Sequence, residues 1–353
     1  MADEIRTRYK HFVVRLVDNP PNPWSSVHVD WLGEPAPLKL EVFEEEAKSL
    51  VTENDSPDVG FRFGINPYRG CQHGCAYCYA RPSHQYLGFG AGTDFERKIV
   101  VKVNAPEVLR RELSRRSWKG DEIALSGNTD CYQPLEASYE LTRACLRVLR
   151  DHRNPVTVIT KGVLVRRDVD LLGELARVAR VRVHVSIPFL DPEISRAMEP
   201  APAAPARRFE AMKALADAGI PVGLSLAPVV PGLNDADIPE LLARAKACGA
   251  SSAFLTLLRL PGEVLPVFRA RLESELPGRA SKVWSQLLDV REGRIDEGRF
   301  GHRMSGSGPR WKVITDVFHL HCRRLGLETK ESPVGDAPKT FRRPSDQGTL
   351  FEV

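Results

Sequence analysis

Three cysteines lie close together in the segment NPYRGCQHGCAYCYA, which covers residues 66–80. Cys71, Cys75 and Cys78 have the spacing C-x3-C-x2-C. Thiolates are the ligands that iron-sulfur clusters prefer, and three of them on one loop can hold three corners of a 4Fe-4S cube. The fourth iron then keeps an open position, as catalytic metal sites do. The spacing therefore indicates a cluster that binds a small molecule directly.

A zinc site built from these three thiols and His73 is the main alternative. Structural zinc usually takes four ligands from two separated pairs, and the sequence has no second Cys/His pair with that spacing. Seven cysteines in a chain of 353 residues also fit a reducing compartment better than a disulfide framework. No apolar run is long enough to span a bilayer and no signal peptide is visible. We therefore predict a cytoplasmic iron-sulfur protein.

Six short β-branched runs alternate with amphipathic segments between residues 60 and 260, and long connections favour parallel strands. The pattern predicts an α/β fold, either a partial (β/α)6 barrel or an open doubly wound sheet. In both folds the chemistry gathers at the carboxyl ends of the strands. The runs cover residues 60–65, 122–127, 156–162, 181–187, 221–229 and 252–260.

The rest of the chain flanks this core. Residues 1–58 are rich in proline and acidic side chains, and we predict an irregular N-terminal extension. The core covers residues 59–262, and residues 263–328 form a C-terminal helical segment with helices near 281–292 and 310–325. Residues 329–353 are proline-rich and charged, which is typical of a disordered tail.

The cysteine array, with Tyr77 just before its last cysteine, resembles the radical S-adenosylmethionine (SAM) superfamily. The string GCQHGCAYCYA is similar to the branch that includes spore photoproduct lyase. The resemblance covers residues 60–260 and implies a partial (β/α)6 barrel with a 4Fe-4S cluster and S-adenosylmethionine as cofactors. It also implies reductive cleavage of S-adenosylmethionine to a 5′-deoxyadenosyl radical, in which the protein supplies positioning and excludes water.

The resemblance also implies a set of cofactor-binding residues at the strand ends, in addition to Tyr77. Thr129 and Asp130 match the contact to the cofactor's amino group, although Asp130 alternatively suits an Asx turn or a helix N-cap. Lys161 matches the contact to the carboxylate, and Ser186 matches the contact to the ribose. An aspartate is a suitable partner for an ammonium group.

Two further residues are candidates for catalysis. Tyr79 follows the last cluster cysteine and suits adenosyl packing or a radical relay, with a ring that shields the cluster as the alternative. Cys131 follows the second strand and is a candidate hydrogen donor to a product radical. In the spore photoproduct lyase type, however, the donor thiol aligns with Gly127, which puts the thymine-dimer reaction itself in question. Cys145, Cys248 and Cys322 fit buried core positions.

Several features favour a nucleic-acid substrate. Residues 97–119 contain eight Lys or Arg against two Glu, which suggests a basic face or, equally, a solvated helix surface. Arginines and aromatic residues also alternate in one later segment, a composition suited to gripping a strand or a flipped base or to packing over a barrel mouth. These residues are Arg299, Phe300, Arg303, Arg310 and Trp311.

The tail carries a Q-x-x-L-F pattern at Gln347, Leu350 and Phe351. This pattern resembles the peptides by which bacterial replication and repair proteins bind the sliding clamp, and a tail is accessible to such a groove. A flavodoxin or a ferredoxin is the electron donor that the radical SAM resemblance implies.

The sequence therefore predicts a radical SAM enzyme that acts on nucleic acid, as a lyase that repairs or modifies a DNA base. A radical SAM enzyme acting on a peptide or small metabolite is the alternative, although the C-terminal segment contains only Cys322 where such enzymes often carry additional clusters. A non-catalytic electron-transfer or sensing protein is the third hypothesis.

Overall fold

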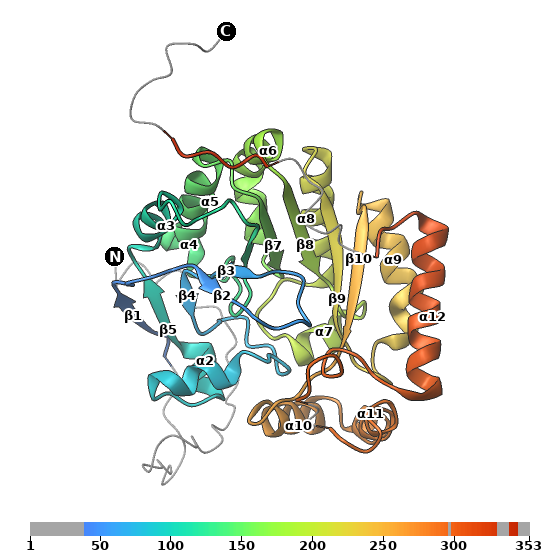
Figure 1. The fold of residues 1–353 in the computed structure, drawn as a ribbon. Helices are drawn as coiled ribbons and strands as arrows, with labels where there is room; N and C mark the ends of the chain where they lie inside the picture. The colour runs from blue at the N-terminus through green and yellow to red at the C-terminus, as the bar shows by residue number, and fades with distance from the viewer. Residues whose placement is uncertain (1–38, 296–297, 330–338, 345–353) are drawn as a thin grey trace.

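The computed structural model describes residues 39–295, 298–329 and 339–344. Its main sheet has seven strands in the order β10-β9-β8-β7-β6-β3-β2 (Figure 1). All six predicted strands are present in it. They are β3 (Phe63–Ile65), β6 (Ile123–Leu125), β7 (Val156–Thr160), β8 (Val181–Ser186), β9 (Val222–Val229) and β10 (Ser252–Leu257).

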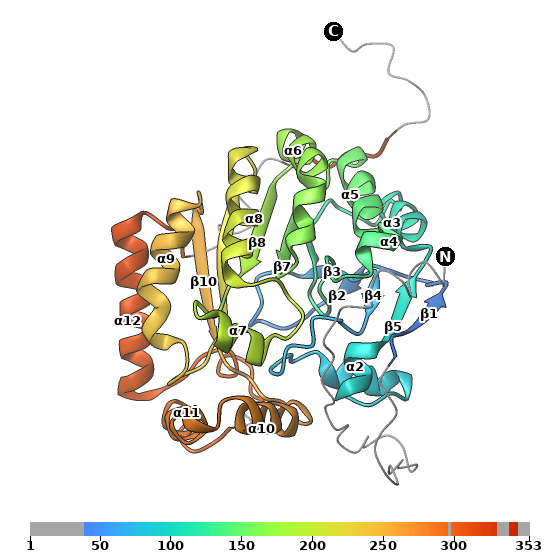
Figure 2. The same ribbon diagram turned by 180° about the vertical axis from the view of Figure 1, so that it is seen from behind.

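Each neighbouring pair among these six strands is parallel, because a helical connection returns the chain to the same end of the sheet. Helices α3, α5, α6, α8 and α9 cover one face of the sheet (Figures 1 and 2). The arrangement is the predicted partial barrel. Its strand order is linear, so β10 and β2 (Thr52–Glu53) end the sheet without pairing to each other.

The covering helices are amphipathic and bury one apolar stripe against the strands. In α5, Leu141, Cys145 and Leu149 lie on the buried side, as their spacing predicted. In α6, Leu171, Leu172 and Leu175 do the same. The bounds of the five helices are Ala105–Leu113 for α3, Leu141–Asp151 for α5, Val169–Val178 for α6, Pro205–Asp217 for α8 and Ile238–Ala247 for α9.

A second sheet of three strands, in the order β1-β5-β4, was not predicted. β1 (Glu41–Glu45) pairs in parallel with β5 (Lys98–Lys102), and β4 (Tyr68–Arg69) pairs antiparallel with β5. β1 and β2 both lie within residues 1–58, where the sequence indicated no regular structure. They are short and acidic, with the sequences EVFEE and TE, and carry no apolar period, so tertiary pairing makes them strands.

Short helices complete the connections around the strand ends. Helix α7 follows β8 and α4 follows β6. The bounds are Arg81–Leu87 for the 3₁₀ helix η1, Thr93–Arg97 for α2, Glu136–Tyr139 for α4, Val163–Asp168 for the 3₁₀ helix η2, Pro192–Met198 for α7 and Asp235–Asp237 for the 3₁₀ helix η3.

The C-terminal segment contains three helices: α10 (Val264–Glu275), α11 (Pro277–Val290) and α12 (Gly308–Leu325). Helices α11 and α12 confirm the two predicted helices, and α10 was missed. Figures 1 and 2 show α10 and α11 at the end of the sheet to which the strand arrows point. They therefore lie at the same end as the carboxyl ends of the strands.

Residues 339–344 are docked on the core, so the prediction of a wholly disordered tail is wrong for this part. The backbone N–H of Arg342 donates to the His152 carbonyl at 2.9 Å, and the Thr340 hydroxyl donates to the Arg153 carbonyl at 2.9 Å. The Phe341 ring stacks on the His152 ring, with 6.3 Å between centroids. Gln347, Leu350 and Phe351 lie outside the described residues.

In the part of the chain that the structure describes, no helix is long and apolar enough to cross a membrane.

Candidate functional site

The three clustered cysteines lie on the loop between β4 and η1. Two turns shape this loop: the Gly74 N–H donates to the Cys71 carbonyl at 3.3 Å, and the Cys78 N–H donates to the Cys75 carbonyl at 3.2 Å. Gly74 has φ +62, a conformation that favours glycine, and a Cβ there would approach the Glu96 carboxyl to 3.2 Å. The conformation of the loop is therefore determined by these two turns and by the close approach of Glu96.

A buried arginine braces the loop from η1. The Arg81 side chain donates to the Cys75 carbonyl at 2.9 and 3.1 Å and to the Ala91 and Gly92 carbonyls, and it pairs with Glu96 at 2.5 Å. Arg81 is fully buried, so these partners replace the water that its charge would otherwise require. This brace was not predicted, because a single arginine in a sequence gives no sign of its burial.

A pair of glutamines fixes the other side of the loop. The Gln72 N–H donates to the Gln133 side chain at 3.0 Å, and the Leu135 N–H donates to the Gln72 side chain at 2.8 Å. The Gln133 amide donates to the Gly70 carbonyl at 3.3 Å. The cysteine loop is thereby bound to the segment that follows β6.

The thiols meet the chemical requirements of an iron-sulfur cluster. Burial and the charges of Asp130, Cys78 and Cys75 raise the pKa of Cys71, so the three sulfurs lie close enough to repel one another as thiolates. A bound metal centre would remove this penalty, because a coordinating thiol is deprotonated. Each cysteine of a cluster binds a different iron, so three thiolates can hold three corners of a 4Fe-4S cube.

His73, the fourth ligand of the zinc alternative, contacts another group. Its Nδ1 lies 3.2 Å from the Asp130 carboxylate, and both side chains are nearly inaccessible to solvent. The imidazole therefore links the cysteine loop to the end of β6. This contact favours the cluster over a zinc site with His73 as a ligand.

A buried carboxylate, Glu199, was not predicted from the sequence. It lies among Lys161, Tyr77 and Cys75. The Tyr77 hydroxyl donates to Glu199, and the Lys161 Nζ lies 3.8 Å from Glu199 and 5.6 Å from the Tyr77 ring centroid. Arg208 pairs with the other Glu199 oxygen at 2.6 Å. Glu199 therefore holds two of the predicted cofactor-binding side chains in place.

Charge is balanced around Lys161. Burial lowers the pKa of Lys161, but Cys75 and Glu199 raise it further, so that the net direction is upward. The ammonium therefore remains protonated beside the cysteine loop, with 15% of the side chain exposed. A cation in this position suits a carboxylate of a ligand bound at the cluster.

Asp130 is engaged by the protein on both oxygens. It accepts hydrogen bonds from the Thr160 hydroxyl at 2.6 Å, from the Lys161 N–H at 2.7 Å and from the Tyr132 N–H at 2.9 Å. The last of these is the Asx turn that the sequence left open. Burial raises the pKa of Asp130, but His73 and these donors lower it further, so that the carboxylate stays ionised.

Thr129 and Ser186 also lie at strand ends and are buried. The Thr129 hydroxyl donates to the Tyr68 carbonyl at 3.1 Å, which leaves its oxygen as an acceptor. Ser186 ends β8 and lies opposite Ser225 of β9 in the parallel register. The buried Ser225 hydroxyl has no hydrogen-bond partner among the described residues, which adds an available polar group beside Ser186.

Tyr79 lies at the open side of the site. Its side chain is 49% exposed, although the hydroxyl donates to the Gly127 carbonyl. Desolvation of the hydroxyl and the nearby Cys78 raise the pKa of Tyr79 to about 12, and Arg259 lowers it. The Phe61 ring would lie 3.3 Å from a Cβ at Gly127. Tyr79 and Phe61 therefore lie at the end of β6, and Arg259, which follows β10, acts electrostatically on the Tyr79 hydroxyl.

Cys131, the candidate hydrogen donor, is deeply buried directly after Asp130, in the loop that follows β6. It is 1% exposed and belongs to the main core. Its carbonyl accepts from the Thr142 hydroxyl at 2.7 Å, and its N–H donates to the Ser126 hydroxyl at 2.8 Å. Cys75 and Tyr77 belong to the same core, so Cys131 stays a candidate hydrogen donor.

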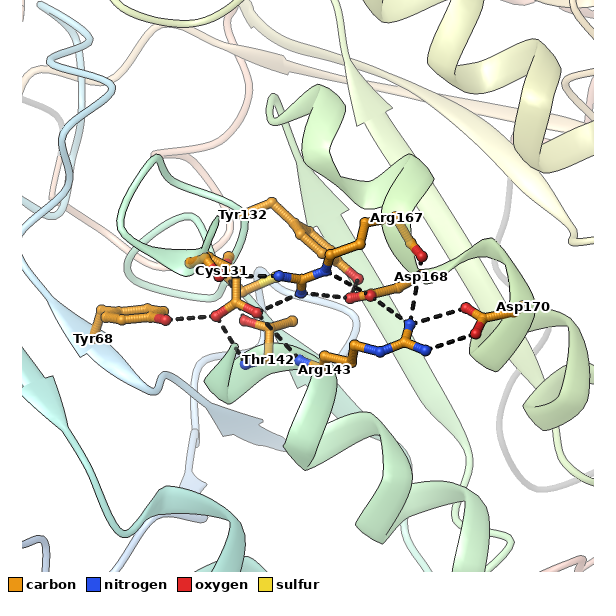
Figure 3. A network of polar contacts seen from close by, with 9 residues as sticks. Tyr68, Cys131, Tyr132, Thr142, Arg143, Arg167, Asp168 and Asp170 are labelled. Carbon is orange, nitrogen blue, oxygen red and sulfur yellow. Dashed lines mark hydrogen bonds and ion pairs between the residues drawn. The ribbon is translucent and has the colours of Figure 1, made fainter. Parts of the chain in front are cut away.

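A buried ion-pair network behind Cys131 fixes this loop (Figure 3). Glu136 accepts from the Tyr68 hydroxyl at 2.5 Å and pairs with Arg167 at 2.6 Å. Asp168 pairs with Arg167 at 2.8 Å and with Arg143 at 2.8 Å. Two carboxylates and two guanidinium groups thus compensate one another where the chain leaves the end of β6.

The arginines and aromatic residues between positions 299 and 311 make contacts within the protein. Trp311 is buried and donates to Ser305 at 3.0 Å, and Arg310 pairs with Asp289 at 2.7 Å. Arg303 pairs with Asp58 and covers the Phe300 ring at 4.3 Å. Arg303 thus joins the loop before β3 to the C-terminal segment, and Arg299, Phe300 and Arg310 remain exposed.

Known structures with a similar fold include spore photoproduct lyase. One, described as complexed with dinucleoside spore photoproduct, has a TM-score of 0.56 and 17% identity, and the match covers 81% of this chain and 80% of that chain. A variant of spore photoproduct lyase has a TM-score of 0.57 and 16% identity over 86% and 88% of the two chains. At these identities the likeness shows the fold alone.

Relatives in sequence are uncharacterised proteins. One from Mycobacterium tuberculosis is 39% identical over 229 residues, which cover 64% of this chain and 67% of the relative. One from Methanocaldococcus jannaschii is 30% identical over 199 residues, which cover 56% of this chain and 71% of the relative.

The sequence model of the Radical SAM superfamily matches residues 65–245, which include the cysteine loop and the strands from β6 to β9. Members of this family are enzymes that use a 4Fe-4S cluster and S-adenosylmethionine. The chain described here belongs to the radical SAM superfamily.

Proposed function

We propose that this radical SAM enzyme acts on a base of a nucleic acid, in a lyase-like repair or modification reaction. The observation that carries the proposal is the exposed Tyr79 beside the cysteine loop, with Phe61 at the same strand end and Arg259, which follows β10, acting electrostatically on its hydroxyl. An aromatic ring and an arginine suit a base and its phosphate. The similar fold of spore photoproduct lyase supports the same substrate class.

Cys71, Cys75 and Cys78 would hold the cluster in this proposal. When bound, the cluster and S-adenosylmethionine supply a one-electron cleavage that yields a 5′-deoxyadenosyl radical. The Lys161 ammonium would hold the cofactor carboxylate, and Tyr77 with Glu199 would keep that ammonium next to Cys75. Thr129 and Ser186 remain the proposed contacts to the amino group and the ribose, and Asp130 would orient His73 and the Lys161 backbone.

The proposal is tested by measuring 5′-deoxyadenosine from anaerobically reconstituted protein with reductant and S-adenosylmethionine, with and without ultraviolet-damaged DNA. We expect the wild type to form it, damaged DNA to increase the yield severalfold, and Cys75→Ala to abolish it. Cys248→Ala is the matched control, because Cys248 is half-buried at the end of α9 and outside the site. Cleavage that is indifferent to DNA would contradict the substrate class and favour a peptide or small metabolite.

Two proposed partners lie beyond the site. The family needs a reductant, for which we propose a flavodoxin or a ferredoxin. The proposed sliding-clamp contact through Gln347, Leu350 and Phe351 is tested by a pull-down of purified clamp with wild type and Phe351→Ala. Equal retention of the clamp by both proteins would exclude that motif.

A further inference from the structure

Basic side chains from two distant parts of the chain meet at the amino ends of the strands. Arg343 donates to the Arg115 and Trp118 carbonyls, at 2.8 Å each. Lys119 donates to the Arg116 carbonyl at 3.3 Å. We define the basic patch as the exposed side chains of Arg110, Arg115, Arg116, Lys119, Arg342 and Arg343.

Residues 339–344 contribute two arginines to the basic patch. Phe341 covers Gly120 so closely that a Cβ at Gly120 would lie 2.3 Å from the Phe341 Cβ. Its ring stacks on His152, and Arg343 lies 5.3 Å from the Phe341 ring centroid. The anchoring of one phenylalanine therefore carries two further arginines to a surface that already has four cations.

The side chains of the basic patch have no carboxylate partner among the described residues. None of its six side chains forms an ion pair within residues 39–295, 298–329 and 339–344. Exposed cations elsewhere commonly do: examples are Arg150 with Glu174, Lys213 with Asp217, Arg244 with Glu240 and Lys312 with Asp316.

Arg110 and Arg343 act together on a buried neighbour. Burial lowers the pKa of His152, and both arginines lower it further, against the opposite effect of Asp151. Like charges that are gathered without counterions attract a polyanion and release its condensed cations on binding.

We propose that the basic patch binds the phosphate backbone of a nucleic acid at the end of the molecule opposite the cysteine loop. This inference rests on the proposed function and deepens it, because it adds a second contact to the same substrate. β9 alone has eight residues, or about 26 Å at 3.3 Å per residue. A duplex that rises about 3.4 Å per base pair therefore needs roughly eight base pairs or more to reach from patch to site.

The test is fluorescence anisotropy of labelled DNA at several salt concentrations, with a duplex of about 30 base pairs and a single strand of about six nucleotides. We expect Arg110→Glu with Arg116→Glu to weaken duplex binding at least about tenfold and to reduce the salt slope by about 2. Binding of the short strand, which is too short to reach from the basic patch to the cysteine loop, falls by a much smaller factor. Phe341→Ala, which releases Arg342 and Arg343, also weakens duplex binding without altering the charge.

Arg177→Glu with Arg324→Glu is the matched control, because both residues are exposed on other helices and change the net charge equally. Equal duplex affinity of the patch variant and the wild type would contradict the proposed role of the basic patch. A wild-type protein that does not bind the duplex would contradict it too. Stimulation of 5′-deoxyadenosine by a short damaged oligonucleotide would in either case still support the proposed function, so the two failures can be told apart.

Discussion

At the scale of single residues, the site depends on buried charges whose partners come from distant parts of the chain. Glu199 joins Tyr77, Lys161 and Arg208, and Arg81 joins the cysteine loop to Glu96. A buried charge that loses its partner is costly, whereas the complete pair is close to neutral in energy. These residues therefore constrain the site more than the exposed pairs do.

We predict that Glu199→Gln destabilises the protein by about 3–5 kcal/mol, because Arg208 then remains buried without its counter-ion. Urea denaturation of the cluster-free protein measures the change. Glu210→Gln is the control, because Glu210 pairs with Arg207 on the exposed surface and its loss costs at most about 1 kcal/mol. Equal midpoints for the two variants would contradict a supporting role for Glu199.

His84 makes stability depend on pH. Burial lowers its pKa to about 4, from the ordinary 6.5, and this effect outweighs the opposite effect of the Lys98 and Asp94 backbone. The unfolded chain therefore binds more protons between pH 6.5 and 4, and stability falls as pH falls through this window. The contribution is about 3 kcal/mol at 1.36 kcal/mol per pKa unit.

We predict that His84→Leu removes this part of the acid sensitivity. Unfolding free energies at pH 7 and pH 4 measure it, and the difference between them shrinks by about 3 kcal/mol relative to wild type. Substitution of the exposed His302 by glutamine leaves the difference unchanged. An unaltered difference in His84→Leu would show that other groups account for the acid sensitivity.

At the scale of elements, the ion-pair network behind Cys131 connects α4, α5 and η2 to the end of β6. Arg167 contacts both buried carboxylates, Glu136 and Asp168. Without Arg167, Asp168 keeps Arg143 as a cationic partner, whereas Glu136 loses the arginine with which it pairs. The position of Asp130, and with it the orientation of His73, depends on this connection.

We predict that Arg167→Ala lowers the unfolding free energy by about 3–5 kcal/mol, because it leaves buried carboxylate charge uncompensated. The neighbouring Arg166 is exposed and forms no ion pair within the described residues, so Arg166→Ala changes stability by about 0.5 kcal/mol or less. Thermal denaturation of both variants distinguishes the network from a general effect of removing an arginine.

The sequence predicted those elements whose apolar residues repeat regularly. The six parallel strands and helices such as α5 and α6 carry that signal, and so do the three clustered cysteines. Helix α10 carries it weakly, because the apolar Leu265 and Ala270 lie outside its buried stripe. Arg81 and Glu199 carry no such signal, because long-range packing alone makes them buried partners.

At the scale of the whole molecule, the linear order of the sheet leaves the partial barrel open, while contacts between distant segments connect its ends. Asp58 meets Arg303 near the carboxyl ends, and the N–H of Ala253 in β10 donates to the Glu328 carbonyl at 2.8 Å. Residues 339–344 connect the C-terminal part of the chain to the opposite end. These contacts make the tertiary structure depend on residues far outside the barrel.

We predict that Gly120→Ala releases residues 339–344, because the new Cβ collides with Phe341. Gly120 and Gly293 both have positive φ, but nothing lies within 4 Å of a Cβ at Gly293. Gly293→Ala therefore pays the same backbone strain, of about 1 kcal/mol, without the collision. Hydrogen exchange at the Arg342 amide accelerates only in Gly120→Ala, and equal protection in both variants would contradict the anchoring.

The docking of residues 339–344 also determines how the protein can be attached to a solid support. Pro344 follows Arg343, whose guanidinium is held at the Arg115 and Trp118 carbonyls, at the end of the sheet remote from Cys71, Cys75 and Cys78. A linker inserted directly after Pro344 would start on that remote side. Protein attached to a sensor chip through such a linker would therefore expose the cysteine loop to the solution and hold the basic patch near the chip surface.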